Sequence, residues 1–178
     1  PKGDMNILDT NQRFNENLLT GCLTIIDTQL KKVSISIENS QCEDALNLFR
    51  VNGNIKNIKI YNSLYDALDL DYSNLIIDNI DIKKAGNDCI DLSSGDSIFS
   101  DVDLSGCGDK GISVGEKSNI FISKSYFLNN NIAIESKDKS VAKVKTSKFI
   151  SNELAFSAYK KNWKYLVDFN IEFTQFIK

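Results

Sequence analysis

The sequence has no histidine and only one proline, one tryptophan and one methionine in 178 residues. The absence of histidine excludes a Ser-His-Asp triad, a Cys-His pair and every zinc site that needs a histidine ligand. Any catalysis would therefore depend on carboxylates, lysine, tyrosine or cysteine. The four cysteines (Cys22, Cys42, Cys89 and Cys107) show no Cys-x-x-Cys spacing, which argues against a structural zinc site.

The charge and the hydropathy exclude further classes of protein. The formal net charge of −3 and the scattered basic residues leave no electrostatic footprint for nucleic acid. No apolar run is long enough to cross a bilayer, so we expect no membrane span. The chain begins Pro1-Lys2-Gly3-Asp4, without an initiator methionine or the apolar core of a signal peptide. We interpret residues 1–178 as one domain and a fragment of a longer chain, with a repeat core over about residues 20–160.

An internal repeat of about 22 residues decides the expected fold. The main apolar series is Leu23, Leu46, Leu68, Ile90 and Ile112, followed by Ile132 after a step of 20 and Leu154 after a step of 22. A second series comprises Ile35, Ile58, Ile80 and Val102, and a third comprises Ile76, Ile98 and Ile120. Phe127 and Phe149 occur near the ends of later repeats, each followed by an asparagine turn.

Within each repeat, apolar and polar residues alternate as in a strand with one buried face. An isolated strand of this length cannot bury its apolar side. Coils stacked about 4.8 Å apart give every backbone group a partner and build a continuous core. The sequence therefore predicts an all-β, single-stranded parallel β-helix of roughly six or seven coils. The strong preference of parallel crossovers predicts that it is right-handed.

The repeat also serves as a map of the surface, because residues one coil apart lie above one another. One column is Asp44, Asp66, Asp88 and Lys110; a second is Asn47, Asp69, Asp91 and Ser113; Asn87 and Asp109 are in register between coils. Like charges at the distance between coils repel, so at least one carboxylate should have a raised pKa unless a cation neutralises the patch.

These columns give the candidate site residues. We predict catalytic roles for Asp66, Asp88, Asp91 and Lys110, substrate contacts for Asp69, Asn87, Asp109, Glu116, Lys117 and Lys137, and a candidate Ca²⁺ site at Asp66, Asp69, Asp88 and Asp91. An aspartate at a turn also caps free backbone amides, so the column of Asp44, Asp66 and Asp88 has a structural alternative. Asp69 and Asp91 lie on strands, where aspartate is disfavoured, and this favours a functional role.

Three segments resemble the polygalacturonase family of pectin hydrolases. They are Asp66-Ala67-Leu68-Asp69-Leu70, Asn87-Asp88-Cys89-Ile90-Asp91-Leu92 and Gly106-Cys107-Gly108-Asp109-Lys110-Gly111-Ile112-Ser113-Val114-Gly115. That family is a right-handed parallel β-helix with the motifs Asn-Thr-Asp, Asp-Asp-Cys-Ile and Gly-His-Gly-x-Ser-x-Gly. By this resemblance Asp66 matches the Asp of the first motif, Asn87 and Asp88 match the pair of the second, and Lys110 stands at the histidine of the third. The hydrolytic set is incomplete, because Asn87 and Lys110 depart from the motifs and Ala133-Ile134-Glu135 stands in place of a later Arg-x-Lys.

The chain resembles more closely a bacterial β-helix region of large surface or secreted proteins, sometimes found beside spore-coat-H-type kinase modules. The added segments are Gly115-Glu116-Lys117-Ser118, Ser136-Lys137-Asp138-Lys139-Ser140 and Ala158-Tyr159-Lys160-Lys161. The resemblance implies an extracellular, cell-surface or periplasmic location and a polysaccharide partner. One hypothesis is a polysaccharide-engaging module with lyase-like or glycoside-hydrolase-like chemistry, in which Lys110 is the base or a stabilising cation and Asp88 or Asp66 is the acid. The alternative is a non-catalytic structural or adhesive solenoid, such as a spike, an adhesin or a surface-layer segment.

Other residues allow several interpretations. Cys89 shares a column of small residues with Ala45, Ala67 and Gly111, which favours a packing role. Bridges between adjacent coils, Cys89–Cys107 or Cys22–Cys42, are an alternative, although each pair is offset along the coil. The column Lys117, Lys137 and Lys160 favours a solvated face, with a basic edge beside the acidic patch as the alternative. Trp163 and Tyr165 are candidates for stacking on a sugar or for covering the end of the core.

Overall fold

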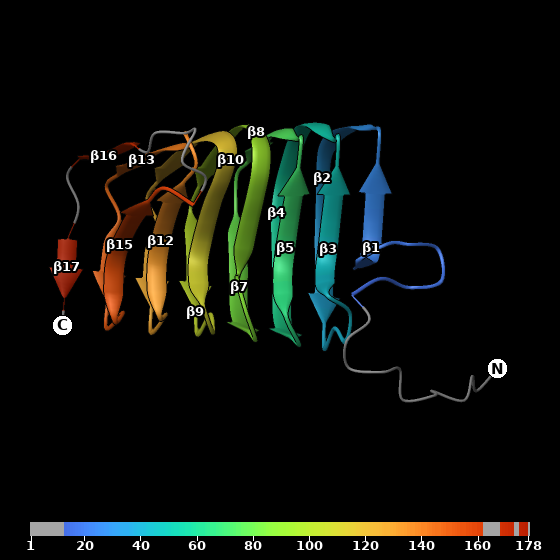
Figure 1. Cartoon of the computed structure of the whole chain (residues 1–178), viewed down its shortest axis with the longest axis horizontal. Coiled ribbons are helices and arrows are strands. Elements are labelled where there is room, and N and C mark those ends of the chain that lie inside the picture. The colour runs from blue at the N-terminus through green and yellow to red at the C-terminus, as the bar shows by residue number, and fades with distance from the viewer. Residues whose placement is uncertain (1–12, 162–167, 173–174, 178) are drawn as a thin grey trace.

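The chain forms a single parallel β-solenoid, in which each coil contributes up to three strands (Figure 1). The computed structural model describes residues 13–161, 168–172 and 175–177. The first series of strands is β1 (Gly21–Ile26), β3 (Asp44–Phe49), β5 (Asp66–Asp71), the first part of β8 (Ile90–Ser100), the first part of β10 (Lys110–Ser123), β12 (Ile132–Lys137) and β15 (Leu154–Tyr159). Figure 1 shows these strands side by side along the length of the rod.

Two further series complete each coil. The second comprises the first parts of β2 (Gln29–Glu38) and β4 (Asn52–Ser63), then β6 (Asn74–Ile77), the later parts of β8 and β10, β13 (Val141–Lys145) and β16 (Asp168–Glu172). The third comprises the later parts of β2 and β4, then β7 (Ile80–Ala85), β9 (Val102–Ser105), β11 (Tyr126–Leu128), β14 (Lys148–Ile150) and β17 (Gln175–Ile177). Within the described residues no helix is long and apolar enough to cross a membrane.

The register of the first series confirms the predicted core column from Leu23 to Ile112, whose successive members are paired on neighbouring strands. The predicted step of 20 to Ile132 is wrong. Ile112 pairs with Ile134, whereas Ile132 takes the position that Lys110 has one coil earlier. Both isoleucines are apolar, so alternation alone could not choose between them.

The other two series are confirmed in part. Ile58, Ile80 and Val102 lie in one buried column, as predicted. Ile76 pairs with Ile98, but Ile98 pairs with Phe121 and not with Ile120. This column faces outward, since Ile76, Ile98 and Phe121 are exposed while Ile120 is buried.

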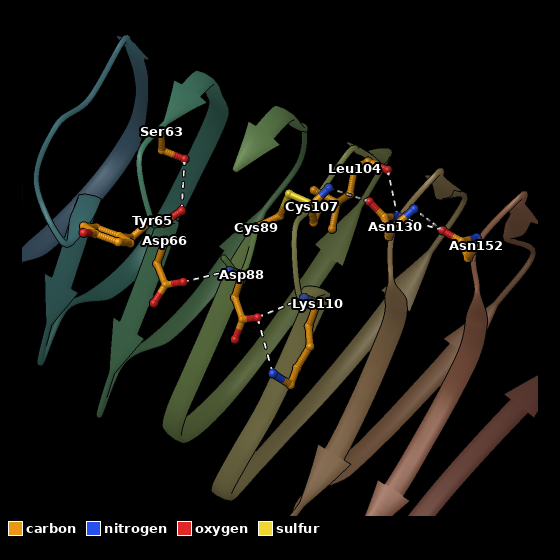
Figure 2. The surroundings of a disulfide bond; sticks show 10 residues. All are labelled: Ser63, Tyr65, Asp66, Asp88, Cys89, Leu104, Cys107, Lys110, Asn130 and Asn152. Carbon is orange, nitrogen blue, oxygen red and sulfur yellow. Dashed lines mark hydrogen bonds and ion pairs between the residues drawn. A yellow bond between two sulfur atoms is a disulfide. The ribbon is translucent and has the colours of Figure 1, made fainter. Parts of the chain in front are cut away.

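The interior is apolar from coil to coil, and an asparagine ladder lies at its edge. Phe127 and Phe149 are buried and stacked, with ring centroids 4.6 Å apart. The buried Asn130 side chain accepts a hydrogen bond from the Cys107 backbone (3.0 Å) and donates to the Asn152 side chain (2.9 Å), as Figure 2 shows. Such side-chain bonds satisfy backbone groups that the turn would otherwise leave unpaired.

The corners between series are made by residues with left-handed backbone. After the first series these are Asp27, Arg50, Tyr72, Ser94, Glu116 and Asp138, and after the third they include Asn39, Asn62, Lys84, Gly106, Asn129 and Ser151. This conformation costs about 1–2 kcal/mol for a residue with a Cβ atom. The corner amides are satisfied by the next coil; for example, the Tyr72 backbone N–H donates to the Ser93 carbonyl at 2.8 Å. At the corners of Glu116 and Asp138 the following lysine, Lys117 or Lys139, is left-handed as well, and the extra residue at Lys117 moves the second series of that coil by one position.

All four cysteines form disulfides, Cys22–Cys42 and Cys89–Cys107. The packing role favoured for Cys89 is therefore only part of its role, because the buried Cys89 is also covalently bonded (Figure 2). The separations are 20 and 18 residues, less than one repeat. Each bond therefore joins the beginning and the end of one coil, not two adjacent coils.

Candidate functional site

In the column of Asp44, Asp66 and Asp88, the last two carboxylates accept backbone hydrogen bonds, whereas Asp44 Oδ2 is buried without a hydrogen-bond partner. The Asp66 Oδ1 atom accepts hydrogen bonds from the Asp88 backbone N–H at 2.8 Å and from the Asn87 side chain at 2.7 Å. The Asp88 Oδ1 atom accepts one from the Lys110 backbone N–H at 2.9 Å, and Figure 2 shows this ladder running from coil to coil. These bonds are the capping of backbone amides at turns that was the alternative to a functional role for this column.

Burial perturbs these carboxylates. It raises the pKa of Asp44 to about 7, and the neighbouring charge of Asp66 acts in the same direction. Burial also raises the pKa of Asp88 to about 7, although the positive charge of Lys110 opposes this, and it raises the pKa of Asp66. The expectation that at least one carboxylate has a raised pKa is therefore confirmed.

A second column projects from the outer face of the first series. It consists of Asn47, Asp69, Asp91, Ser113 and Glu135, which are paired in this order and are called the polar row below. The Asn47 Nδ2 atom donates to Asp69 Oδ2 at 2.8 Å and to Asp71 Oδ2 at 3.3 Å. Asp71 was missed in the sequence, although it lies two residues after Asp69 and therefore on the same face of the strand.

Asp69 is the most strongly perturbed of these groups. Burial, followed by the negative charges of Asp71, Asp44 and Asp91, raises the pKa of Asp69 to about 9. Burial likewise raises the pKa of Asp71. At neutral pH Asp69 is therefore a neutral acid that can donate a proton or a hydrogen bond.

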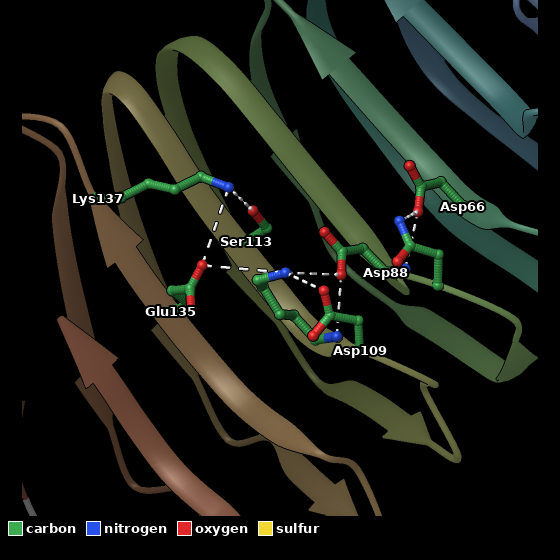
Figure 3. A network of polar contacts seen from close by, with 8 residues as sticks. Asp66, Asp88, Asp109, Ser113, Glu135 and Lys137 are labelled. Atoms are coloured by element: carbon green, nitrogen blue, oxygen red, sulfur yellow. Dashed lines mark hydrogen bonds and ion pairs between the residues drawn. The ribbon is translucent and has the colours of Figure 1, made fainter. Parts of the chain in front are cut away.

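Lys110 lies among three carboxylates, Asp88, Asp109 and Glu135, which are labelled in Figure 3. Its Nζ atom contacts Asp109 and lies 3.5 Å from Asp88 Oδ1 and 4.0 Å from Glu135 Oε1. Burial alone would lower the pKa of Lys110, but the hydrogen bond to Asp109 and the surrounding negative charges raise it above its usual value. Lys110 therefore remains an ammonium ion at neutral pH, which suits a stabilising cation and not a base.

Lys137 and Glu135 extend this network along the polar row. The Lys137 Nζ atom donates to Ser113 Oγ at 2.8 Å and lies 3.9 Å from Glu135 Oε1. Glu135 is 3% exposed, and its Oε1 atom has no hydrogen-bond partner. In the sequence, Glu135 was noted only because it stands in place of the Arg-x-Lys motif. A step of 22 from Ser113 would have placed it in the polar row.

The arrangement as a whole is that of a right-handed β-helix. A family described as a right handed beta helix region matches residues 10–171 of the chain. The chain belongs to this family. Searches of the curated proteins and of the solved structures each found no match.

Membership in the right-handed β-helix family confirms the predicted fold and its handedness. The resemblance to polygalacturonases and the association with kinase modules stay predictions. In this β-helix, the two residues that depart from the polygalacturonase motifs make defined contacts. Asn87 donates to Asp66, and Lys110 contacts Asp109.

The remaining predicted residues lie at or beyond the corner of the coil. Glu116 and Lys117 form the left-handed corner after the first part of β10, and the Glu116 carbonyl accepts a hydrogen bond from Ser94 Oγ at 2.7 Å. The basic column of Lys117, Lys137 and Lys160 is wrong, because Lys137 pairs with Tyr159 and the Lys117 backbone N–H donates to the Asp138 carbonyl.

Two predictions remain untested. The part of the chain that the structure describes contains no group of three or more cysteine, aspartate or glutamate side chains placed to hold a metal ion. This finding gives no support to the Ca²⁺ site at Asp66, Asp69, Asp88 and Asp91, which stays a prediction. Trp163 and Tyr165 lie outside the described residues.

Proposed function

We propose that this β-helix is an extracellular or cell-surface module that binds a polysaccharide along the polar row. The observation that carries the proposal is the gathering of hydrogen-bonding side chains from five successive coils on one face, in register at every step. A linear polymer of sugars offers hydroxyl groups at regular intervals, and a solenoid offers partners at regular intervals of about 4.8 Å.

The chemistry of the row supports binding to hydroxyl groups. The neutral Asp69 both donates and accepts, while Glu135 Oε1 lacks a hydrogen bond in a buried position. A buried acceptor without a partner is costly, and a ligand hydroxyl that reached it would recover that cost. Lys110 and Lys137 lie within 4.0 Å of the same oxygen and keep Glu135 paired with positive charge.

A lyase mechanism with Lys110 as the base has less support. The carboxylates around Lys110 hold its ammonium group in the charged form, and an ammonium ion cannot take a proton from a sugar. Asp66 and Asp88 are occupied by backbone amides of the next coil. The polar row therefore supports recognition in preference to bond cleavage.

The location rests on the two disulfides. Disulfides persist in oxidising compartments and are rare in the cytosol, so Cys22–Cys42 and Cys89–Cys107 support an extracellular, cell-surface or periplasmic site.

The test is affinity electrophoresis of the purified chain through gels that contain soluble polysaccharides, both neutral and uronate-containing. We expect retardation by at least one polymer and a loss of retardation in Lys137→Gln, which removes the charge beside Ser113 and Glu135. Lys59→Gln is the control, because Lys59 is exposed on β4, away from the first series. Equal migration of the wild type in every gel would reject the proposal.

A second candidate is a structural or adhesive solenoid, and the carboxylate ladder favours it. Asp66 and Asp88 form the amide bonds expected of a scaffold, and the two disulfides reinforce individual coils. This candidate predicts that Lys137→Gln and Asp69→Asn leave every interaction of the protein unchanged.

A further inference from the structure

An open groove of about 610 Å³ lies on the outer face of the second series, around the corner from the polar row. Its apolar part is the row of Ile76, Ile98 and Phe121, which are paired from β6 to β8 to β10. The three side chains are 45%, 46% and 37% exposed. Apolar side chains aligned along a sheet face are a feature of binding surfaces, whereas single exposed ones are common on any protein.

A row of amides and one carboxylate runs beside the apolar row. It consists of Asn52, Asn74, Asp96 and Asn119. The Asn74 side chain donates to Asn52 Oδ1 at 2.9 Å and accepts from the Asp96 backbone at 2.9 Å, and Asn119 donates to Asp96 Oδ1 at 2.7 Å. These bonds fix the amide orientations. Since an amide nitrogen carries two N–H groups, Asn74 and Asn119 each keep one for a ligand.

We propose that this groove is a second carbohydrate site, which holds an uncharged, linear polysaccharide along the solenoid axis. The inference rests on the proposed function, since it assigns the same class of ligand to a different face. A pyranose ring has apolar C–H faces and polar hydroxyl edges. The apolar row fits the faces, with Phe121 as the aromatic platform, and the amide row fits the edges.

The charges of the groove favour an uncharged ligand. Its lining contains one acidic residue, Asp96, and one basic residue, Lys143, so the two charges balance. The polar row differs, because it is surrounded by several carboxylates and two ammonium groups. A polyuronate would find no excess of cations in the groove.

The sheet that forms the groove argues against an extended peptide. Extended peptides commonly bind by adding a strand to an exposed sheet edge. Here β6 pairs with β4 and β8, and β10 pairs with β8 and β13, so the backbone groups on both sides of these strands are occupied. Only side chains face the groove, and a ligand must be recognised by apolar contact and side-chain hydrogen bonds.

Isothermal titration calorimetry with mixed-linkage β-glucan, xylan and galactomannan tests this site, with polygalacturonate as the charged comparator. Removing the Phe121 ring in Phe121→Ala should weaken binding of a neutral polymer about tenfold, in line with the loss of an aromatic contact. Asn74→Ala should weaken it as well. Tyr126→Ala is the control, because Tyr126 is an exposed aromatic residue on the third series, outside the groove.

The outcomes separate the two proposals. Weakening by Phe121→Ala but not by Tyr126→Ala or Lys137→Gln supports the groove. Neutral-polymer binding that survives Phe121→Ala and is lost in Lys137→Gln overturns the groove and leaves the polar row intact. Tighter binding of polygalacturonate than of all three neutral polymers also overturns the groove. Absence of binding to any polymer rejects both. Melting curves of each variant establish that the fold is retained.

Discussion

Asp69→Asn should stabilise the protein at neutral pH. The pKa of Asp69 is about 9 in the fold against 3.8 in a free side chain, so the unfolded chain releases a proton at pH 7 that the folded chain keeps. Each pH unit between these values lowers the free energy of unfolding by about 1.4 kcal/mol. At pH 7 the accumulated cost is about 4 kcal/mol, part of it shared with Asp71. Asparagine carries no such cost, and its carbonyl can accept the bond that Asn47 now donates to Asp69.

Urea unfolding followed by circular dichroism at pH 4, 5.5, 7 and 8.5 measures this effect. We expect the variant and the wild type to have similar midpoints at pH 4, which is close to the pKa of the unfolded side chain, so that the cost of keeping Asp69 protonated in the fold has barely begun to accumulate. The variant should gain about 2–4 kcal/mol at pH 7 and more at pH 8.5. Asp78→Asn, at an exposed position on the surface, is the control and should show no such trend. A gain that is the same at all four values of pH, or a loss at pH 7, would refute the electrostatic explanation.

Three further predictions concern the scaffold. Mild reductant should open the Cys22–Cys42 disulfide before the buried Cys89–Cys107 disulfide, as measured by thiol alkylation and mass spectrometry. Loss of the Cys89–Cys107 disulfide should lower the free energy of unfolding in urea by about 3 kcal/mol. Thr146→Gly should raise the melting temperature by the equivalent of about 0.5–1 kcal/mol, because a β-branched residue now holds a left-handed corner. Asn130→Ala should lose about 2 kcal/mol in urea unfolding, since it removes the side chain that bonds the Cys107 amide and the Leu104 carbonyl.

The architecture was predictable because the repeat occurs at two levels. Alternation within a strand identified the buried faces, and the step of 22 between Leu46, Leu68 and Ile90 identified their stacking. The same step placed Asp69 beside Asp91. The pKa of Asp69 is raised as expected, by burial first and by the neighbouring carboxylates second. These predictions succeeded because both periods reflect backbone geometry.

The errors arose where side-chain character does not determine the register. Ile132 and Ile134 are both apolar, so composition could not identify the partner of Ile112. The extra left-handed residue at Lys117 moved Phe121 into the column of Ile98, and lysine carries no signal for that conformation. The turn-capping role of Asp66 was foreseen as an alternative, but only coordinates show which oxygen meets which amide.

The left-handed corners make each coil geometrically self-contained. Since Arg50, Tyr72 and Ser94 take the same conformation at the same point of successive coils, the path of one coil does not depend on its distance from either end. A duplicated segment such as residues 66–87 could therefore be inserted without altering its neighbours' turns. It would lengthen the polar row and the apolar groove together by about 4.8 Å. The number of repeats therefore sets the length of both surfaces.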